Sequence, residues 1–413
     1  MSATEMALAG PEVVVKASRR RFTMEDKREI VREADGRKTP GAVPREAAVA
    51  ADAALSRERR RHRIGVIPGD GIGPEVVAEG LKVLRALAPR AGFAVELVDY
   101  PFGAEHWLRT GEVLSASALE EMRGLDAIYF GAAGDPRVPP GVLELGLIHG
   151  IVQELDLFVN VRPIRLYAER LCPVKGKGPA DVDLVVIREA TEDCFGAGRF
   201  IRKGAPDEVA LGQMAFSRPG QARALRYAFE LARRRGGKRR VSVVHQDNAI
   251  GAHDLIERVS VEVAREFPDV ERDHMAPDAA AMWLIKNPEA FDVIFSTNLI
   301  GGILSDITAV LGGGLGLSGS ARIHPGRTSL FEPTHGSAPK YAGQGVASPI
   351  GAIAALGLLL EEIGEAAAAG AIERAVGGLL ASGTVRSVDA RSGQRTAEVG
   401  DLVAGAVSRA ALD

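Results

Sequence analysis

The chain has 413 residues, of which 46% are hydrophobic, and this length exceeds what one hydrophobic core usually serves, so two domains are expected. Its 51 Lys and Arg residues nearly balance 54 Asp and Glu residues, which excludes a general electrostatic attraction to nucleic acid or membranes. Two cysteines, Cys172 and Cys194, are too few for a disulfide scaffold. Because the start has no signal-peptide pattern and no apolar run reaches about 18 residues, a cytoplasmic location is predicted.

Residues 1–62 differ in composition from the rest of the chain. They hold 14 Lys or Arg residues against 10 Asp or Glu residues, with few large apolar residues. The stretch from Arg19 to Pro44 loosely resembles the opening helices of a transposase helix-turn-helix, with Thr23 in the place of a helix cap. One basic helix lacks a second recognition element, so a helical or disordered extension is favoured over a DNA-binding module, and nucleic acid is not an expected partner.

From Arg63 onward the sequence alternates between strand-like and helix-like stretches. Apolar runs of strand length occur at Ile64–Ile67, Ala127–Phe130, Leu184–Ile187, Val241–Val244 and Val293–Phe295. Helical periodicity occurs at Pro74–Leu87, Gly220–Arg233, Ala252–Glu266 and Ile350–Ile363. Alternation of this kind predicts an α/β fold.

Five motifs follow one another in this region. The first, IGVIPGDGIGPEVV at 64–77, predicts a strand, a glycine turn and a helix that opens with Pro74. Its glycine spacing is not that of the GxGxxG dinucleotide fingerprint. The other four motifs are LDLFVNVRPIRLY at 155–167, VVIREATEDCFGAG at 185–198, STNLIGGILSD at 296–306 and FEPTHGSAPKYAG at 331–343.

Together these motifs resemble those of the β-decarboxylating dehydrogenases of isocitrate, isopropylmalate and tartrate, over roughly Arg63 to Val407. The resemblance implies an α/β fold of two domains. Residues 63–157 and 315–413 would form a large cofactor-binding domain, and residues 158–314 a smaller substrate and dimerisation domain. It also implies a homodimer in which each active site draws residues from both subunits.

In the β-decarboxylating dehydrogenases, the adenine half of a nicotinamide cofactor lies against a loop with the sequence HGSAP. In this chain the HGSAP loop is His335–Pro339. The residues that follow, Lys340 and Tyr341, are those of NADP-using bacterial isocitrate dehydrogenases, whereas an acidic residue would suit the free ribose hydroxyls of NAD. Ser348 departs from the family asparagine, so NAD stays open. The expected cofactor-binding residues are Asn248, Asn298, His335, Gly336, Ser337, Ala338, Lys340, Tyr341 and Ser348.

The catalytic positions of the family are altered in this chain. The lysine that removes the hydroxyl proton is replaced by Gln246, and the tyrosine that reprotonates the enol is replaced by Phe195; neither side chain can donate or accept a proton near neutral pH. One metal-binding aspartate is replaced by Gly302, while Asp306 and, from the second subunit, Asp278 are retained. Binding of Mg²⁺ or Mn²⁺ is therefore weakened without being forbidden.

The substrate-binding positions are also partly altered. Arg162 and Arg188 match two of the three family arginines that bind the substrate carboxylates, and the third is Val152. Structural ion pairs with Glu189 or Asp156 are the alternative role for the two arginines. A small anionic substrate with fewer carboxylates than isocitrate, or with a phosphate, is predicted.

Three functional hypotheses follow. The first is an NAD(P)-dependent dehydrogenase that oxidises a secondary hydroxyl of an anionic molecule, such as a sugar or nucleotide, without decarboxylation. Its general base would be His149, His245, Asp247 or Asp278. The second is a non-catalytic nucleotide-binding subunit of a hetero-oligomer. The third is the standard decarboxylating activity, which requires a water or a neighbouring group to replace both the lysine and the tyrosine.

Overall fold

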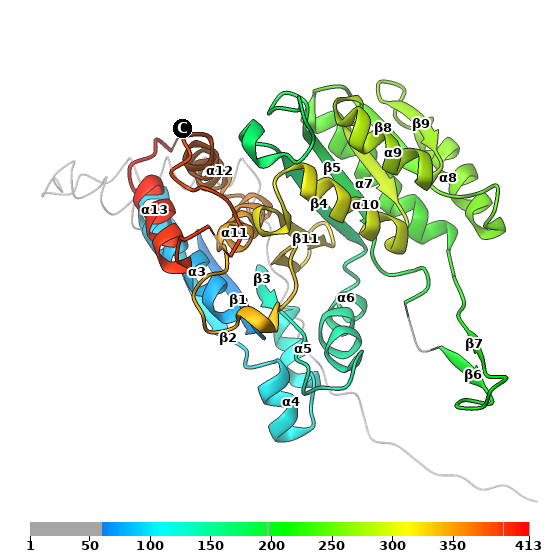
Figure 1. Ribbon diagram of the computed structural model, residues 1–413, viewed down its shortest axis with the longest axis horizontal. Helices are drawn as coiled ribbons and strands as arrows, with labels where there is room; N and C mark the ends of the chain where they lie inside the picture. The colour runs from blue at the N-terminus through cyan, green and yellow to red at the C-terminus, as the bar shows by residue number, and fades with distance from the viewer. Residues whose placement is uncertain (1–59, 196–197, 391, 413) are drawn as a thin grey trace, which may run out of the picture. The chain divides into compact units, whose positions relative to one another are not determined.

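The computed structural model describes residues 60–195, 198–390 and 392–412 (Figure 1). Thr23 and the stretch that resembles a helix-turn-helix lie outside the described residues. Strand β1 begins at Arg61, two residues before the boundary at Arg63 that the sequence indicated. Among the described residues, no helix combines the length and apolar character that a membrane span requires.

The first part of the chain alternates strands with helices up to the middle of the sheet. Its elements are β1 (Arg61–Gly69), α3 (Gly73–Ala91), β2 (Ala94–Asp99), α4 (Ala104–Thr110), α5 (Ala116–Met122), β3 (Ala127–Ala132), the π-helix η1 (Glu144–His149), α6 (Gly150–Glu154), β4 (Val159–Arg165), η2 (Glu169–Leu171), β5 (Asp183–Glu189), β6 (Arg199–Ile201) and β7 (Val209–Leu211).

The second part continues the alternation and ends in three helices. Its elements are α7 (Arg218–Arg235), β8 (Arg240–Val244), η3 (Gly251–His253), α8 (Asp254–Ala264), β9 (Glu271–Met275), α9 (Pro277–Lys286), η4 (Pro288–Ala290), β10 (Val293–Ser296), α10 (Asn298–Leu311), η5 (Leu315–Leu317), β11 (Gly319–Ile323), β12 (Ser329–Pro333), η6 (Pro339–Tyr341), α11 (Ile350–Glu362), α12 (Ala366–Ala381) and α13 (Thr396–Val407).

One sheet contains ten strands of the described chain, in the order β2-β1-β3-β12-β11-β4-β5-β10-β8-β9. Pairing is parallel from β2 to β12 and again from β5 to β9. Between these halves, β11 and β4 run antiparallel to their neighbours. Strands from both ends of the sequence therefore share one half of the sheet, and strands from its middle share the other.

The strands predicted from apolar runs are buried on both faces, as expected for parallel strands covered by helices. All six residues of β3 and all four of β10 are buried. On one half of the sheet, α3 packs against both α11 and α13 (Figure 1). The Tyr129 hydroxyl on β3 donates to the carbonyl of Ala352 on α11 at 2.8 Å. Gly80 on α3 leaves room for that ring, because a Cβ there would overlap the hydroxyl.

The five predicted strands and four predicted helices are confirmed, although their ends differ from the predicted bounds by up to a few residues. The helix expected at 252–266 begins as the 3-10 turn η3 and is α-helical only from Asp254 to Ala264. The division into a large domain of 63–157 and 315–413 and a small domain of 158–314 stays a prediction.

Candidate active site

Two buried arginines lie on adjacent antiparallel strands in the middle of the sheet. Arg162 is on β4 and Arg188 on β5, with Asn160 opposite Arg188 in the register. The Arg162 guanidinium donates to the Ser305 hydroxyl at 2.7 Å and forms an ion pair with Asp306 at 3.1 Å, both on α10. Its Nε donates to Asn160 Oδ1 at 3.1 Å. These contacts fix one guanidinium at the junction of β4 and α10.

Arg188 is 8% exposed and has an unused donor. It donates to the side-chain oxygen of Asn298, whereas its buried Nε has no hydrogen-bond partner among the described residues. Burial lowers the pKa of its guanidinium well below the usual value, and the positive charges of Arg162 and Arg322 lower this pKa further. A buried cation with an unsatisfied N–H favours a bound anion.

Gly302, which replaces a metal-binding aspartate of the family, leaves space beside Arg188. Gly302 on α10 faces the guanidinium, and a Cβ at that position would lie 3.5 Å from Arg188 Nη1. The alternative ion pairs considered from the sequence do not form. Glu189 accepts hydrogen bonds from Thr191, and Asp156 pairs with Arg223.

Asn298, predicted as a cofactor-binding residue, is directed toward Arg188. Besides accepting from Arg188, its amide donates to the carbonyls of Ala190 at 3.1 Å and Glu192 at 3.3 Å. In this conformation the amide orients an arginine of the substrate site.

A third arginine near this cluster was not identified from the sequence. Arg322 on β11 pairs with Glu332 on β12 at 2.6 Å, and both are largely buried. Its charge lowers the pKa of Arg162, after the larger effect of burial. The alternation of side chains along β11 could have indicated an inward arginine, but the neighbours of Arg322 depend on strand order.

His149 and Phe195, two of the predicted catalytic positions, lie close together. His149 ends the π-helix η1, and its ring centroid is 6.3 Å from that of Phe195. The Gln153 amide lies 3.2 Å from His149 Nε2 and also donates to the Thr191 carbonyl. Burial, and then the charge of Arg322, lower the pKa of His149. The imidazole is therefore neutral near pH 7 and can accept a proton.

Gln246 and Asn248 are adjacent on the loop after β8. The Gln246 amide donates to Asn248 Oδ1 at 2.8 Å, and the Gln246 backbone N–H donates to His253 Nδ1 at 2.9 Å. Both side chains are at least partly exposed. They are therefore available to a substrate or a second subunit.

The expected cofactor loop packs on the glycine turn of the first motif. Ile72 N–H donates to the Ser337 carbonyl at 2.8 Å. Gly71 has a φ of +60°, and a Cβ there would overlap that carbonyl, so glycine is required on both counts. Asp70 is buried and accepts from the backbone N–H groups of Ala104 at 2.7 Å and Gly134 at 3.0 Å.

Side chains along the same loop carry unused polar atoms. Thr334 Oγ1 and His335 Nε2 are buried without a hydrogen-bond partner in the described part of the chain. Burial lowers the pKa of His335. Ala338 is left-handed, with a φ of 39°. Lys340 Nζ lies 4.6 Å from the centre of the Tyr341 ring, and Ser348 Oγ accepts from the Ile350 N–H at 3.4 Å. Unpaired buried donors and acceptors of this kind fit a polar ligand such as a dinucleotide.

The carboxylates expected to hold a divalent cation lie on two helices. Asp306 on α10 has a side chain that is 58% exposed, so its carboxylate can bind a cation beside Arg162. Asp278 is in the first turn of α9, where it accepts from the Ala279 N–H at 2.9 Å. Mg²⁺ is commonly held by one or two carboxylates and several waters. Asp306 and Asp278 therefore fit Mg²⁺ or Mn²⁺ even though position 302 is a glycine and supplies no carboxylate.

Comparison with known proteins identifies relatives over most of the chain. Residues 63–403 match the family described as Isocitrate/isopropylmalate dehydrogenase. The chain is 46% identical over 321 residues to a 3-isopropylmalate dehydrogenase of Thermobifida fusca, which covers 77% of this chain and 90% of the relative. It is 44% identical over 351 residues to that of Mycobacterium avium, covering 84% of this chain and 100% of the relative.

Two solved structures have the same fold. An isocitrate dehydrogenase from Methylococcus capsulatus superposes with a TM-score of 0.77 at 34% identity, covering 84% of this chain and 100% of that one. A β-decarboxylating dehydrogenase (TK0280) from Thermococcus kodakarensis superposes with a TM-score of 0.67 at 34% identity, covering 84% and 96%.

These relatives overturn the main functional hypothesis, hydroxyl oxidation without loss of carbon dioxide. Sequences 44 and 46% identical to this chain are named 3-isopropylmalate dehydrogenase, which is a decarboxylating dehydrogenase. The hypothesis is wrong because it equated the loss of a lysine and a tyrosine with the loss of a reaction step. A proton can be moved by any titratable group that reaches the substrate.

Proposed function

Because the chain belongs to the isocitrate/isopropylmalate dehydrogenase family and is an NAD(P)-dependent oxidoreductase acting on a CH–OH group, we propose that it oxidises and decarboxylates a 3-substituted malate of the 3-isopropylmalate class. The observation that carries this proposal is the pair of buried guanidinium groups, Arg162 and Arg188, with an unpartnered donor on Arg188. Each guanidinium suits one carboxylate, so together they suit the C1 and C4 carboxylates of a malate.

The position of the carboxylates decides the chemistry. Oxidation of the C2 hydroxyl to a ketone turns the C4 carboxylate, which is bonded to C3, into that of a β-keto acid. Its bond to C3 then breaks to release carbon dioxide, and the electron pair moves into the C2 ketone to give an enolate. Arg162 and Arg188 hold the acid in place through both steps, and they need no titratable group to do so.

His149 is the general base in this proposal. Substrate displaces the Gln153 amide from Nε2 of His149, and this nitrogen then takes the C2 hydroxyl proton as the hydride leaves C2. The resulting imidazolium then returns that proton to C3 of the enolate. One proton therefore serves both steps, which replaces the lysine and the tyrosine with a single imidazole.

The aromatic ring of Phe195 and the amide of Gln246 have supporting roles. Phe195, 44% exposed, shields the His149 side of the pocket from water. Gln246 of the second subunit orients the substrate hydroxyl by a hydrogen bond. Substitution Gln246→Ala should then lower kcat by about ten- to a hundredfold, an amount typical of a lost positioning contact.

The cofactor is NADP in this proposal. Bound nicotinamide supplies the hydride acceptor. Lys340 is exposed beside the HGSAP loop, where its ammonium can pair with a 2′-phosphate, and Tyr341 lies next to it. His335 and Thr334 use their unpaired buried atoms to bind the cofactor, while Gly336, Ser337, Ala338 and Ser348 shape the loop and Asn248 contacts the nicotinamide amide.

Asp306, together with Asp278 from the second subunit, holds Mg²⁺ or Mn²⁺ in this proposal. When bound, the cation polarises the C2 oxygen and stabilises the enolate charge. Arg162, which already pairs with Asp306, orients that carboxylate toward the substrate.

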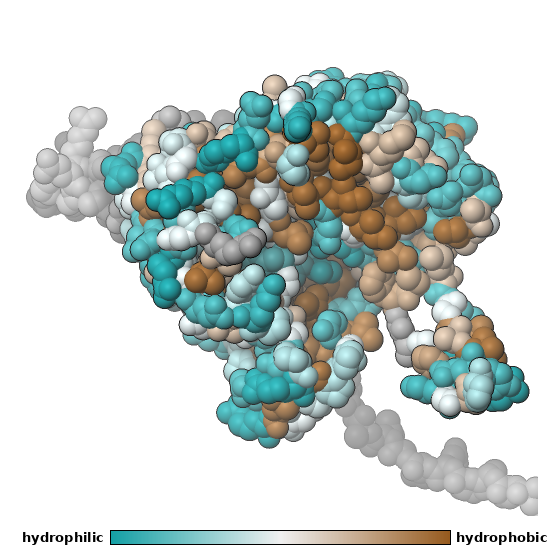
Figure 2. All heavy atoms as spheres, viewed as in Figure 1, coloured by the Kyte–Doolittle hydropathy of each residue, from teal (hydrophilic) through white to brown (hydrophobic). Residues whose placement is uncertain are grey.

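The functional unit in this proposal is a homodimer that associates through α9 and α10. Exposed apolar side chains gather on these helices (Figure 2), where a second subunit would cover them. Met282 and Ile303 are each 57% exposed. The other members of this apolar face are Trp283, Ile285, Leu299 and Val310.

A coupled assay of the full chain tests the reaction. The protein is incubated with Mg²⁺, NADP or NAD, and 3-isopropylmalate, isocitrate or tartrate, while reduced cofactor and carbon dioxide are both measured. Equal amounts of the two products with 3-isopropylmalate are expected. Reduced cofactor without carbon dioxide, or no turnover with any of the three acids, would contradict the proposal.

A further inference from the structure

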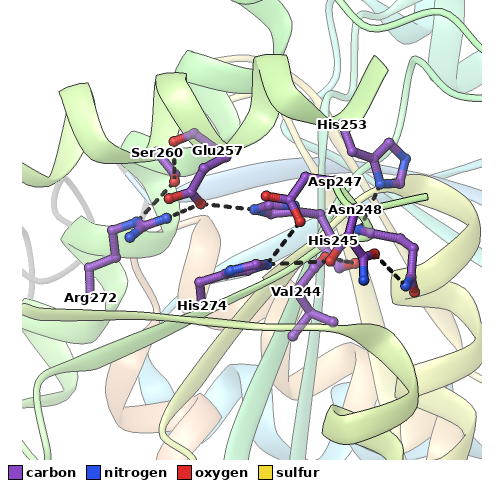
Figure 3. A network of polar contacts seen from close by, with 11 residues as sticks. Val244, His245, Asp247, Asn248, His253, Glu257, Ser260, Arg272 and His274 are labelled. Carbon is purple, nitrogen blue, oxygen red and sulfur yellow. Dashed lines mark hydrogen bonds and ion pairs between the residues drawn. The ribbon is translucent and has the colours of Figure 1, made fainter. Parts of the chain in front are cut away.

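A second cluster of metal-ligand side chains lies at the outer edge of the sheet. Strands β8 and β9 are the last two in the order and pair in parallel, with Val244 opposite Met275. His245 and Asp247 follow β8, and His274 is in β9. Asp247 Oδ1 lies 4.0 Å from His245 Nδ1 and 3.9 Å from His274 Nε2 (Figure 3). These three side chains come together because the two strands are neighbours.

The protonation of His245 is set by a carboxylate behind it. Glu257 on α8 lies 3.0 Å from His245 Nε2, and Glu257 is held by an ion pair with Arg272 on β9 (Figure 3). A carboxylate at this distance accepts a hydrogen bond from Nε2–H, which leaves Nδ1 with its lone pair. His245 is completely buried, and its Nδ1 has no hydrogen-bond partner among the described residues. This nitrogen is therefore an unused acceptor that lies close to the ligand atoms of Asp247 and His274.

In many metal sites a carboxylate accepts a hydrogen bond from a histidine that binds the metal through its other ring nitrogen. Ligating histidines usually donate their second ring N–H to a carboxylate, which fixes the tautomer and makes the ligand nitrogen more basic. Two imidazoles and one carboxylate are the ligand set of many divalent transition-metal sites, with further positions left for water. We propose that His245, Asp247 and His274 bind a divalent transition-metal ion, and that this ion is Zn²⁺.

Metal binding requires a small rearrangement of the exposed ligand. The rings of His245 and His274 are stacked, with centroids 4.1 Å apart and planes at 13°. Because an imidazole lone pair lies in the plane of its ring, the His274 ring must turn out of the stack to share an ion with His245. Its side chain is 32% exposed, and its Nε2 makes a long 3.4 Å contact with the His245 carbonyl, so little opposes the turn.

The distances between ligand atoms also leave room for an ion. In a tetrahedral site with bonds of about 2.0–2.2 Å, ligand atoms are roughly 3.3–3.6 Å apart. The separations of 3.9 and 4.0 Å from Asp247 Oδ1 are about half an ångström longer than this, and all three ligand atoms lie within 4.8 Å of one another before the His274 ring turns. Asp247 has a side chain that is 33% exposed, so water can reach the remaining coordination position.

The proposed ion would act on the loop that carries Gln246. Gln246 lies between two of the ligands in sequence, and its amide contacts Asn248, the residue after Asp247. An ion held by His245 and Asp247 fixes the backbone on both sides of Gln246. Its three ligands do not include Asp306 or Asp278, and the proposal stands whether or not the proposed reaction is correct.

Cobalt binding to the full-length protein tests the site. The protein is stripped of metal with a chelator and titrated with Co²⁺ in the absence of Mg²⁺, and visible d–d absorption is recorded. One equivalent of Co²⁺ should give the intense bands of a low-coordinate nitrogen and oxygen site, and one equivalent of Zn²⁺ should abolish them. Absence of these bands would overturn the proposal.

Variants show which residues hold the ion. His274→Ala and Asp247→Asn should remove the bands, and Glu257→Gln should weaken Co²⁺ binding by about ten- to a hundredfold. Glu271→Gln, on the same strand as His274, is the matched control and should keep the bands. Asp306→Asn should also keep them, because it alters only the active-site carboxylate. Loss of the bands in Asp306→Asn, or their persistence in both ligand variants, would refute the assignment.

Discussion

Arg188 Nη1 lies 3.5 Å from the point where a side chain at Gly302 would begin, so one glycine decides whether this buried cation has a carboxylate beside it. Without that carboxylate, the guanidinium is left for the substrate. The same glycine also leaves the proposed cation with one carboxylate fewer on α10.

Restoring an acid at this position should strengthen cation binding. Gly302→Asp adds an oxygen ligand near Asp306, and Mn²⁺ affinity should rise by about tenfold or more, an amount typical of adding a charged ligand. Measurement of Mn²⁺ binding by electron paramagnetic resonance checks this. Gly302→Ala is the control and should leave the Mn²⁺ affinity unchanged, because its Cβ makes only an ordinary contact with Arg188. Equal affinity in all three proteins would disprove a cation site at Asp306.

The guanidinium of Arg188 should be needed for substrate binding. Arg188→Lys keeps a positive charge but loses the planar pair of donors, and kcat/KM should fall by about a hundredfold or more. Steady-state kinetics with the proposed malate measure this. Arg226→Lys, at an exposed ion pair with Glu266, serves as control and should retain full activity. A similar kcat/KM for both variants would argue against a substrate carboxylate at Arg188.

The acid limb of the pH–rate profile should depend on Arg322. As the proposed base, His149 works when neutral, so kcat falls as the pH drops through its folded pKa, which burial and then Arg322 lower. Arg322→Gln removes a positive charge, raises the pKa of His149 and moves the acid limb to higher pH. Arg322→Lys keeps the charge and should keep the limb in place. An acid limb that does not move in Arg322→Gln would exclude His149 as the group that titrates.

Lys340 should set the preference between cofactors. Lys340→Asp puts a negative charge beside the HGSAP loop, so kcat/KM for NADP should fall by about tenfold or more through repulsion of the 2′-phosphate. The value for NAD should stay the same or rise. Initial rates with both cofactors provide the measurement, and Lys175→Asp, at an exposed position away from the HGSAP loop and from α9 and α10, is the control. If the two cofactors lose activity equally, Lys340 is not the discriminating residue.

The sequence was most informative where a strand is buried on both faces. β3 and β10 are continuous apolar runs, because helices cover both sides of them. β9 was not identified, since its sequence ERDHM is that of a partly exposed edge strand with polar side chains. The family motifs located Arg162 and Arg188, which are adjacent in the structure.

Contacts that depend on strand order could not be predicted in the same way. The proximity of Arg322 to the arginine pair requires that β11 lie beside β4, although the two strands are far apart in sequence. Likewise, His274 meets His245 only because β8 and β9 are neighbours. Neither the composition nor the local pattern of the sequence contains these pairings.

The place of β12 in the sheet has a consequence for synthesis of the protein. β3 pairs with β1 on one side and with β12 on the other, and β12 begins only at Ser329. While the ribosome makes the intervening segment, one side of the fully apolar β3 has no partner strand. An unpaired strand of this kind is prone to aggregation. The nascent chain should therefore depend on chaperones until late in translation, and truncation before Ser329 should yield insoluble protein.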